Sequence, residues 1–135
     1  MWAAEKARGR GFEDMVLLNE HGCVAECTAA NIFFVDSGGK VSTPPQSSGC
    51  LAGVSRQILL EMGSSSGVPV AEADITIEEM WAADEVFISS TTREVQPVSC
   101  IESHEYKPAP GPVTEGLARS FTEYVRNHAA KDPAR

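Results

Sequence analysis

Short strand-like segments, each closed by glycine or proline, limit how this chain folds. The clearest is Asn-Ile-Phe-Phe-Val-Asp at residues 31–36, where the β-branched and aromatic residues that favour strands are concentrated. The Ser-Gly-Gly that follows at residues 37–39 predicts a tight turn, so residues 40–43 return as a second strand. Pro44 and Pro45 then end that strand, because proline removes a donor from the hydrogen-bond ladder. The pattern predicts a sheet whose neighbouring strands are joined by hairpins.

The rest of the chain adds further strands and three helices. Strands are predicted at residues 15–19 and 23–26, which form a hairpin, at residues 69–76 and 85–89, and in extended pieces around Val95, Val98 and Ile101. Helices are predicted from Ser55, a candidate N-cap that precedes Ile58, Leu59 and Met62, over residues 77–83, and from Val113 to about His128, with Leu117, Phe121 and Val125 on one face. Strands and helices that mix without strict alternation predict an α+β or mixed α/β domain.

Size, charge and hydropathy exclude several classes of protein. The 135 residues suit one domain with a buried core. Lysine plus arginine is 11 and aspartate plus glutamate is 19, so the net charge of -8 repels phosphate backbones and argues against nucleic-acid binding. No apolar run approaches the ~20 residues of a membrane helix, and charged residues interrupt the region where a signal peptide would lie. We therefore expect a cytoplasmic protein that binds neither membranes nor nucleic acid.

The four cysteines do not follow a metal-binding or disulfide pattern. Cys23 and Cys27 are four residues apart, Cys50 and Cys100 are isolated, and the three histidines are scattered along the chain. A zinc site needs ligands clustered at a workable spacing, so we expect no metal site. Reduced, buried thiols that pack as small hydrophobic groups are the expectation instead.

Two segments are candidate anion-binding sites. Leu-Ala-Gly-Val-Ser-Arg at residues 51–56 lies at a helix start, where free N–H groups and the helix dipole favour negative charge, and Gly53 lets the backbone approach a ligand closely. Ser-Ser-Thr-Thr at residues 89–92 places four hydroxyls at the carboxyl end of a strand. Each segment also has an ordinary interpretation, as an N-cap and as a polar loop respectively. Two such segments in one small domain suggest a ligand that carries a phosphate.

Glu26 is the one acid in the predicted apolar strand at residues 23–26. A carboxylate at such a position is costly unless a cation or hydrogen-bond donors meet it. The residues leave two interpretations open: a functional carboxylate, or a buried structural pair with Arg56 or another base.

Several motifs that follow one another along the chain carry a family resemblance. They are Glu-Asp-Met-Val-Leu-Leu-Asn at 13–19, Gly-Cys-Val-Ala-Glu at 22–26, Asn-Ile-Phe at 31–33, Thr-Pro-Pro at 43–45, Leu-Ala-Gly-Val-Ser-Arg at 51–56, Ala-Asp-Glu-Val-Phe at 83–87 with Thr91 and Val-Gln-Pro-Val at 95–98, and Gly-Pro-Val-Thr at 111–114. In this order the sequence closely resembles class IV (fold type IV) pyridoxal-phosphate-dependent aminotransferases, the branched-chain and D-amino-acid transaminase family. The resemblance implies a mixed sheet curled into a pseudo-barrel with flanking helices, as in the large domain of that family.

The resemblance also implies roles for individual residues. Glu26 would face the pyridine nitrogen of pyridoxal 5'-phosphate and keep it protonated. The start of the helix at Gly53 would hold the phosphate through the backbone amides of Val54 and Ser55 and the Ser55 hydroxyl, and Thr91 would add its own hydroxyl. A last position, Ser90, stands where relatives often have glycine, so that its side chain would narrow the pocket or add a donor.

One family feature has no counterpart among these residues. In the family, the lysine that forms the Schiff base lies upstream of the Ala-rich helix that leads into residues 11–14, so its position falls before Met1. None of the four lysines matches its motif, and none is predicted to be catalytic: Lys6, Lys40, Lys107 and Lys131. We expect residues 1–130 to correspond to the C-terminal cofactor-binding domain without the smaller N-terminal domain, and residues 131–135 to be a frayed tail.

The resemblance implies transamination between amino acids, branched-chain ones first, and 2-oxo acids. The isolated chain is expected to be weakly active or inactive. Two alternatives stay open: an elimination of the aminodeoxychorismate lyase type, and a non-catalytic domain that binds a partner. Relatives are commonly homodimers, so a homodimer, or self-association through an exposed apolar face, is also implied.

Overall fold

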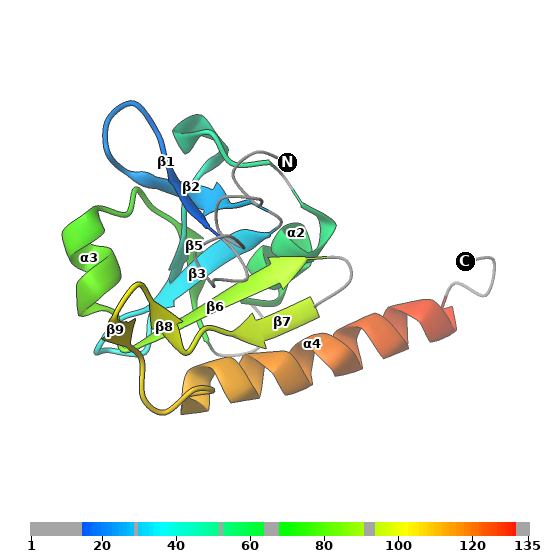
Figure 1. The fold of residues 1–135 in the computed structure, drawn as a ribbon. Coiled ribbons are helices and arrows are strands. Elements are labelled where there is room, and N and C mark those ends of the chain that lie inside the picture. The colour runs from blue at the N-terminus through cyan, green and yellow to red at the C-terminus, as the bar shows by residue number, and fades with distance from the viewer. Residues whose placement is uncertain (1–14, 29, 52, 64–67, 91–93, 132–135) are drawn as a thin grey trace.

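A five-stranded mixed sheet forms the centre of the molecule in the computed structural model, which describes residues 15–28, 30–51, 53–63, 68–90 and 94–131 (Figure 1). Its strands, in spatial order, are β5 (Val70–Glu72), β4 (Val41–Thr43), β3 (Asn31–Val35), β6 (Glu85–Ser90) and β7 (Glu94–Pro97). β4 and β5 are parallel, and the other neighbours are antiparallel. The central pair, β3 and β6, aligns Asn31 with Ser89 at one end and Val35 with Glu85 at the other.

Two small hairpins lie beside this sheet. β1 (Val16–Leu18) and β2 (Val24–Cys27) form the predicted first hairpin, and β8 (Cys100–Ile101) pairs with β9 (His104–Glu105). The mixed α/β class is therefore confirmed. The described strands group as three sheets, and their closure into a pseudo-barrel is not confirmed.

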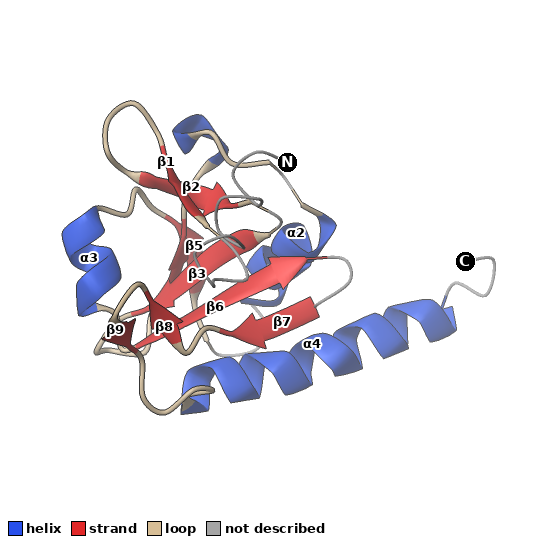
Figure 2. Cartoon of the chain, in the orientation of Figure 1, coloured by secondary structure: helices blue, strands red, loops and turns tan. Residues whose placement is uncertain are grey.

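Helices cover both faces of the central sheet (Figure 2). They are α2 (Val54–Gly63), α3 (Ile77–Ala82) and α4 (Pro112–Lys131), together with a 3₁₀ turn over Gln46–Ser48. α3 begins at residue 77, as the sequence predicts. Thr76 is its N-cap and forms a capping box with Glu79. No helix among the described residues has both the length and the apolarity to cross a bilayer.

Alternate residues of β3 and β6 build two separate cores. Ile32 and Phe34 face the side of α3 and β2, where they meet Met80 and Val24. On the opposite face the Phe33 ring stacks on Phe87, with centroids 4.8 Å apart, and these rings pack against residues of α2 and α4. Because both faces of these strands are covered, their sequences are continuous apolar runs rather than alternating patterns.

Three local expectations differ from the structure. Ser55 is the second residue of α2 and does not serve as its N-cap. The strand expected over residues 69–76 ends at Glu72, because the chain leaves β4 and the Ile75 carbonyl accepts a hydrogen bond from the Val24 N–H instead. Val125 is 39% exposed, since α4 extends past the edge of the sheet (Figure 1).

Most of the residues at the two ends of the chain lie outside the described residues, so few of the predictions for them are tested. α4 continues to Lys131, three residues beyond the end predicted at His128. The rest of the expected frayed tail, residues 132–135, lies outside the described residues, as does the Ala-rich segment before residue 15.

The cysteine expectation is half correct. None of the four cysteines forms a disulfide, and Cys27 and Cys50 are buried, but Cys23 is half-buried and Cys100 is exposed. No metal-ligating cluster occurs within the part of the chain that the structure describes.

Candidate functional site

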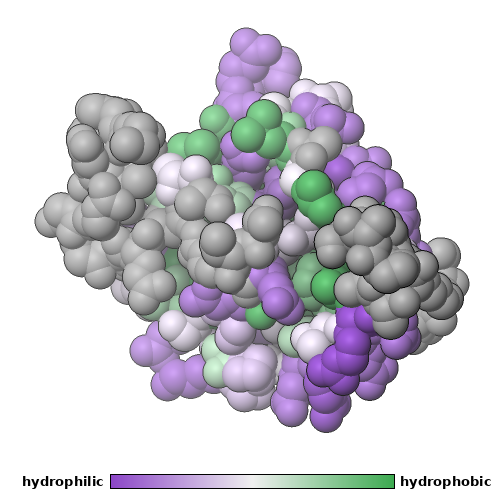
Figure 3. Space-filling view, turned by 90° about the vertical axis from the view of Figure 1, so that its right-hand side faces the viewer, coloured by the Kyte–Doolittle hydropathy of each residue, from purple (hydrophilic) through white to green (hydrophobic). Residues whose placement is uncertain are grey.

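The predicted site residues lie where the start of α2 meets the end of β6. Figure 1 shows the β6 arrowhead ending beside α2, with the β1–β2 hairpin above both. Figure 3 views the molecule from the right-hand side of Figure 1, and hydrophobic residues reach the surface at several places on this face. Two of the most exposed apolar side chains of the described residues come from this region, Leu51 at 74% and Val54 at 71%.

Glu26 is half-buried on β2, and its carboxylate has a backbone donor. The Leu51 N–H donates to Glu26 Oε1 over 2.9 Å. The alternative in which Arg56 pairs with Glu26 is wrong, because the Arg56 guanidinium donates to the Glu72 carboxylate and, over 3.1 Å, to the Pro44 carbonyl. Arg56 therefore joins α2 to β5 and leaves the Glu26 carboxylate to the Leu51 backbone.

The first turn of α2 presents free backbone donors. By position, the N–H groups of Val54, Ser55 and Arg56 lack partners within the helix. No described side chain accepts a hydrogen bond from them; the Ser55 hydroxyl points elsewhere and donates to the Ser90 carbonyl over 3.2 Å. Ser55 thus ties α2 to β6, while its amide stays available for an anion.

Gly53 lies against Asn31 of β3. A Cβ placed on Gly53 would be 2.5 Å from Asn31 Oδ1, which is closer than real Cβ contacts. Glycine is therefore required here by close approach. Asn31 was not predicted as an individual site residue, although an amide at the start of a fully buried strand is a signal that its side chain has a specific partner.

The end of β6 provides a second polar group. Ser89 is 1% exposed, and its hydroxyl has no hydrogen-bond partner among the described residues. Ser90 is half-buried, and its carbonyl accepts from Ser55. Thr91, predicted to add a hydroxyl to the same site, lies outside the described residues, as does Thr92.

Burial also raises the pKa of the Cys50 thiol, which precedes Leu51 in the loop before α2. The pKa of Cys50 is raised, first by burial and further by the negative charges of Glu26 and Glu72, while Arg56 opposes the shift. The Cys50 thiol donates to the Pro44 carbonyl over 3.4 Å. Cys50 is thus a neutral packing group rather than a nucleophile.

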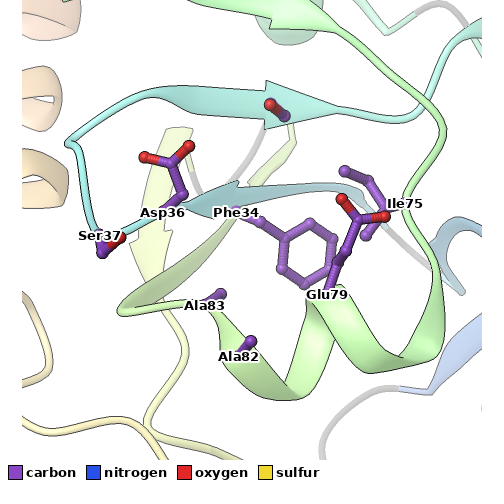
Figure 4. A pocket seen from close by; sticks show the side chains of 8 residues that line it. Phe34, Asp36, Ser37, Ile75, Glu79, Ala82 and Ala83 are labelled. Atoms are coloured by element: carbon purple, nitrogen blue, oxygen red, sulfur yellow. The ribbon is translucent and has the colours of Figure 1, made fainter.

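A separate hollow of about 220 Å³ lies between α3 and the β3–β4 turn and contains none of the predicted site residues (Figure 4). Phe34 and Ile75 line it together with two acids, Asp36 and Glu79. Both carboxylates accept hydrogen bonds from nearby backbone N–H groups. Asp36 accepts from Gly38 and Lys40 in the turn that follows it, and Glu79 accepts from Thr76 in the capping box of α3.

Comparison with known proteins identifies the family. The sequence model described as amino-transferase class IV matches residues 1–101. The chain belongs to the class IV aminotransferase family. A probable branched-chain-amino-acid aminotransferase of Thermotoga maritima is 36% identical over 115 residues, which cover 84% of this chain and 42% of that protein. A D-alanine aminotransferase of Listeria monocytogenes is 36% identical over 103 residues, covering 76% of this chain and 35% of the relative.

Solved structures agree with the fold of this class IV chain. The branched-chain amino acid aminotransferase of Thermobaculum terrenum, solved in its PLP form, superimposes with a TM-score of 0.85 at 35% identity, covering 91% of this chain and 40% of that one. The branched-chain aminotransferase of the archaeon Thermoproteus uzoniensis, solved with norvaline, gives a TM-score of 0.84 at 36% identity, over 90% and 40% of the two chains. The chain thus spans about two fifths of the length of these relatives.

Proposed function

We propose that this chain forms the cofactor-binding part of a pyridoxal-phosphate-dependent aminotransferase that moves amino groups between amino acids and 2-oxo acids. One observation carries the proposal: the Glu26 carboxylate and the free amides of α2 stand on either side of the same short loop. Leu51 and Val54 are three residues apart, so their Cα atoms lie within about 11 Å of each other. A small aromatic ring that carries a phosphate fits within that limit.

The residues at the α2 end fit a phosphate. Free N–H groups and the positive end of the helix dipole attract a dianion. Because Gly53 has no side chain, the loop before these amides can pack against Asn31. The Ser89 hydroxyl, buried without a described partner, adds an unused polar group to this end of the sheet. Val54 and Ser55 would hold the phosphate through their amides, and Ser90 and Thr91 would add contacts of their own.

The carboxylate end fits a pyridine nitrogen. The Leu51 N–H occupies Glu26 Oε1 and fixes the direction of the carboxylate, while no described residue forms an ion pair with it. Glu26 would therefore hold a proton at the ring nitrogen through a charge-assisted hydrogen bond. When bound, the protonated cofactor ring accepts the electron pair left behind when the substrate loses its α-proton.

The lysines that the structure describes do not change the expectation that the Schiff-base lysine lies elsewhere. Lys40 follows the β3–β4 turn, Lys107 pairs with Glu105 after β9 at 2.7 Å, and Lys131 ends α4. None of them belongs to the elements that build the site, and Lys6 lies outside the described residues. We therefore propose that this chain supplies the phosphate and ring contacts and that the lysine's proton-transfer role comes from outside residues 1–135.

Binding of pyridoxal phosphate to the full chain tests the proposal. Isothermal titration is expected to show one saturable site for pyridoxal phosphate. Inorganic phosphate should displace pyridoxal phosphate from this site, and pyridoxal should bind there more weakly. Borohydride reduction with peptide mapping is expected to find only scattered, substoichiometric lysine adducts. The absence of saturable binding would contradict the proposal, whereas a single stoichiometric adduct would move the anchoring lysine into this chain.

Substrate choice is the finer part of the proposal. Relatives named for branched-chain amino acids support these as the first amino donors, with D-alanine as the second candidate because several relatives are D-alanine aminotransferases. Transfer to 2-oxoglutarate from each donor, assayed in a longer chain that also carries the Schiff-base lysine, separates the two. Pyruvate release from aminodeoxychorismate would show the lyase reaction instead. A homodimer is part of the same proposal and is tested by light scattering.

A further inference from the structure

Both polar groups of the Leu51 peptide backbone are held by buried or half-buried side chains from two different strands. Its N–H donates to Glu26 Oε1 of β2 over 2.9 Å. Its carbonyl accepts from Asn31 Nδ2 of β3, also over 2.9 Å, and from the Gly53 N–H over 3.0 Å. The loop that leads into α2 is thus fixed at one residue, while the Leu51 side chain itself is 74% exposed.

Asn31 has little freedom to move away from this loop. It is 7% exposed and stands at the first position of β3, opposite Ser89 on β6. Its Nδ2 donates to the Leu51 carbonyl, and its Oδ1 lies 2.5 Å from the position that a Cβ on Gly53 would take. A single side-chain amide therefore contacts the loop at Leu51 and at Gly53, immediately before the free amides of α2.

Resting on the function proposed above, we propose that Asn31 is a positioning residue for both ends of the cofactor site. Through Gly53 it sets the place of the α2 amides that bind the phosphate. Through the Leu51 peptide it aims the N–H that orients the Glu26 carboxylate. Asn31 touches neither the phosphate nor the ring; it acts on both through one short loop.

The chemistry of the side chain explains why an amide stands here. A carboxylate at residue 31 would face the Leu51 carbonyl without a donor and would place a negative charge near an anion site. A hydroxyl is too short to span the gap to Leu51 that Nδ2 closes at 2.9 Å. The side chain at residue 31 must carry a donor that reaches the Leu51 carbonyl and must also fit beside Gly53. The asparagine amide meets both requirements.

The test compares Asn31→Ala with Thr43→Val in the full chain. Thr43 is a matched control, because it is 1% exposed, lies in the same sheet and donates to the Ile32 carbonyl over 2.8 Å, a hydrogen bond that involves neither Leu51 nor Gly53. The readouts are the dissociation constants of pyridoxal phosphate and of pyridoxal, with urea unfolding measured alongside. Asn31→Ala is expected to weaken pyridoxal phosphate binding about tenfold and to reduce its preference over pyridoxal. Thr43→Val is expected to lower stability without changing that preference.

Gly53→Ala keeps the proposal testable if Asn31→Ala does not fold, because it disturbs the same contact and leaves Asn31 in place. Gly53→Ala forces its Cβ against Asn31 Oδ1 and is expected to reduce the same preference. Where Asn31→Ala does fold, the double variant Gly53→Ala with Asn31→Ala removes the clash, so it is expected to bind no worse than Asn31→Ala alone.

The outcomes separate the two proposals. If the wild-type chain binds pyridoxal phosphate and Asn31→Ala weakens both ligands equally, in proportion to lost stability, Asn31 is only structural and this inference is wrong. Additive losses in the double variant would overturn it as well. If the wild-type chain shows no preference for pyridoxal phosphate over pyridoxal, the proposed function fails first and takes the positioning role with it.

Discussion

At the scale of single residues, the carboxylate of Glu26 owes its orientation to a backbone donor rather than to a cation. The Leu51 N–H reaches it over 2.9 Å, and the nearby arginine, Arg56, is engaged with Glu72. A neutral amide oxygen at residue 26 would accept the same backbone hydrogen bond. The fold and the proposed function therefore make different demands on this position, and a conservative substitution separates them.

Glu26→Gln is expected to keep the fold and impair the cofactor site. Since the Leu51 N–H keeps an acceptor, the free energy of unfolding should change by less than about 1 kcal/mol. Loss of the charge that stabilises the protonated ring nitrogen should weaken pyridoxal phosphate binding about tenfold or more. Spectrophotometric titration of the bound cofactor and urea unfolding measure the two effects. Glu78→Gln on the exposed face of α3 is the charge-matched control, and equal losses in both variants would count against the role of Glu26.

At the scale of secondary-structure elements, the long helix α4 begins on a buried carboxylate. Glu85 of β6 is 6% exposed and accepts from the Thr114 N–H over 2.8 Å and from the Val113 N–H over 3.2 Å. It satisfies two amides that have no partner within the helix and complements the helix dipole. Gly111 packs directly against this carboxylate, so the loop before α4 and the start of β6 are fitted to each other.

Gly111→Ala is expected to destabilise the fold by about 2 kcal/mol or more. Its Cβ would overlap the Glu85 carboxyl group, so Glu85 must move and its two hydrogen bonds to α4 are weakened. Gly116→Ala within α4 is the matched control, because nothing lies within 4 Å of its added Cβ. That change should stabilise by about 0.5–1 kcal/mol, as alanine favours helix over glycine. Thermal unfolding of both variants measures the two changes in stability. If Gly111→Ala is as stable as the wild type, Gly111 does not pack against Glu85 as described.

At the scale of the whole molecule, Tyr106 joins parts of the chain that are distant in sequence. It is 3% exposed beside the β8–β9 hairpin, and its hydroxyl donates to the Met80 carbonyl of α3 over 2.7 Å. Its ring also contacts His104, which in turn lies against Trp81. Burial raises the pKa of Tyr106 to about 12, so the folded protein holds the neutral phenol at pH values where an unfolded chain releases the proton.

Stability is therefore expected to fall at alkaline pH. The contribution is complete below about pH 10, where the unfolded tyrosine is still neutral, and is lost as the pH rises to about 12; the difference between these pKa values corresponds to at most about 2.7 kcal/mol. Urea unfolding between pH 8 and pH 12 measures it, taking ~10 as the unfolded pKa. Tyr106→Phe should remove most of this slope, and Tyr124→Phe, at a half-buried position on α4, should remove less. An equal slope in wild type and Tyr106→Phe would place the alkaline transition elsewhere.

Much of this architecture follows from local sequence. Strand propensity and Gly-containing turns account for the β1–β2 and β3–β4 hairpins, because a tight turn leaves the following residues no other neighbour. The apolar run in β6 and the spacing of Leu59, Met62, Leu117 and Phe121 likewise identify residues that are buried. The order of the motifs identified the family, which the comparisons confirm.

The partners of polar groups were decided only by the tertiary structure. Arg56 bonds Glu72, sixteen residues away, and Glu26 and Asn31 meet at the two polar groups of Leu51. No local pattern encodes such pairs, since they depend on which segments the sheet brings together. Hydrophobic burial is nonspecific and can be inferred from composition and period. A hydrogen bond needs two atoms within about 3 Å of each other, and only the folded chain determines which atoms those are.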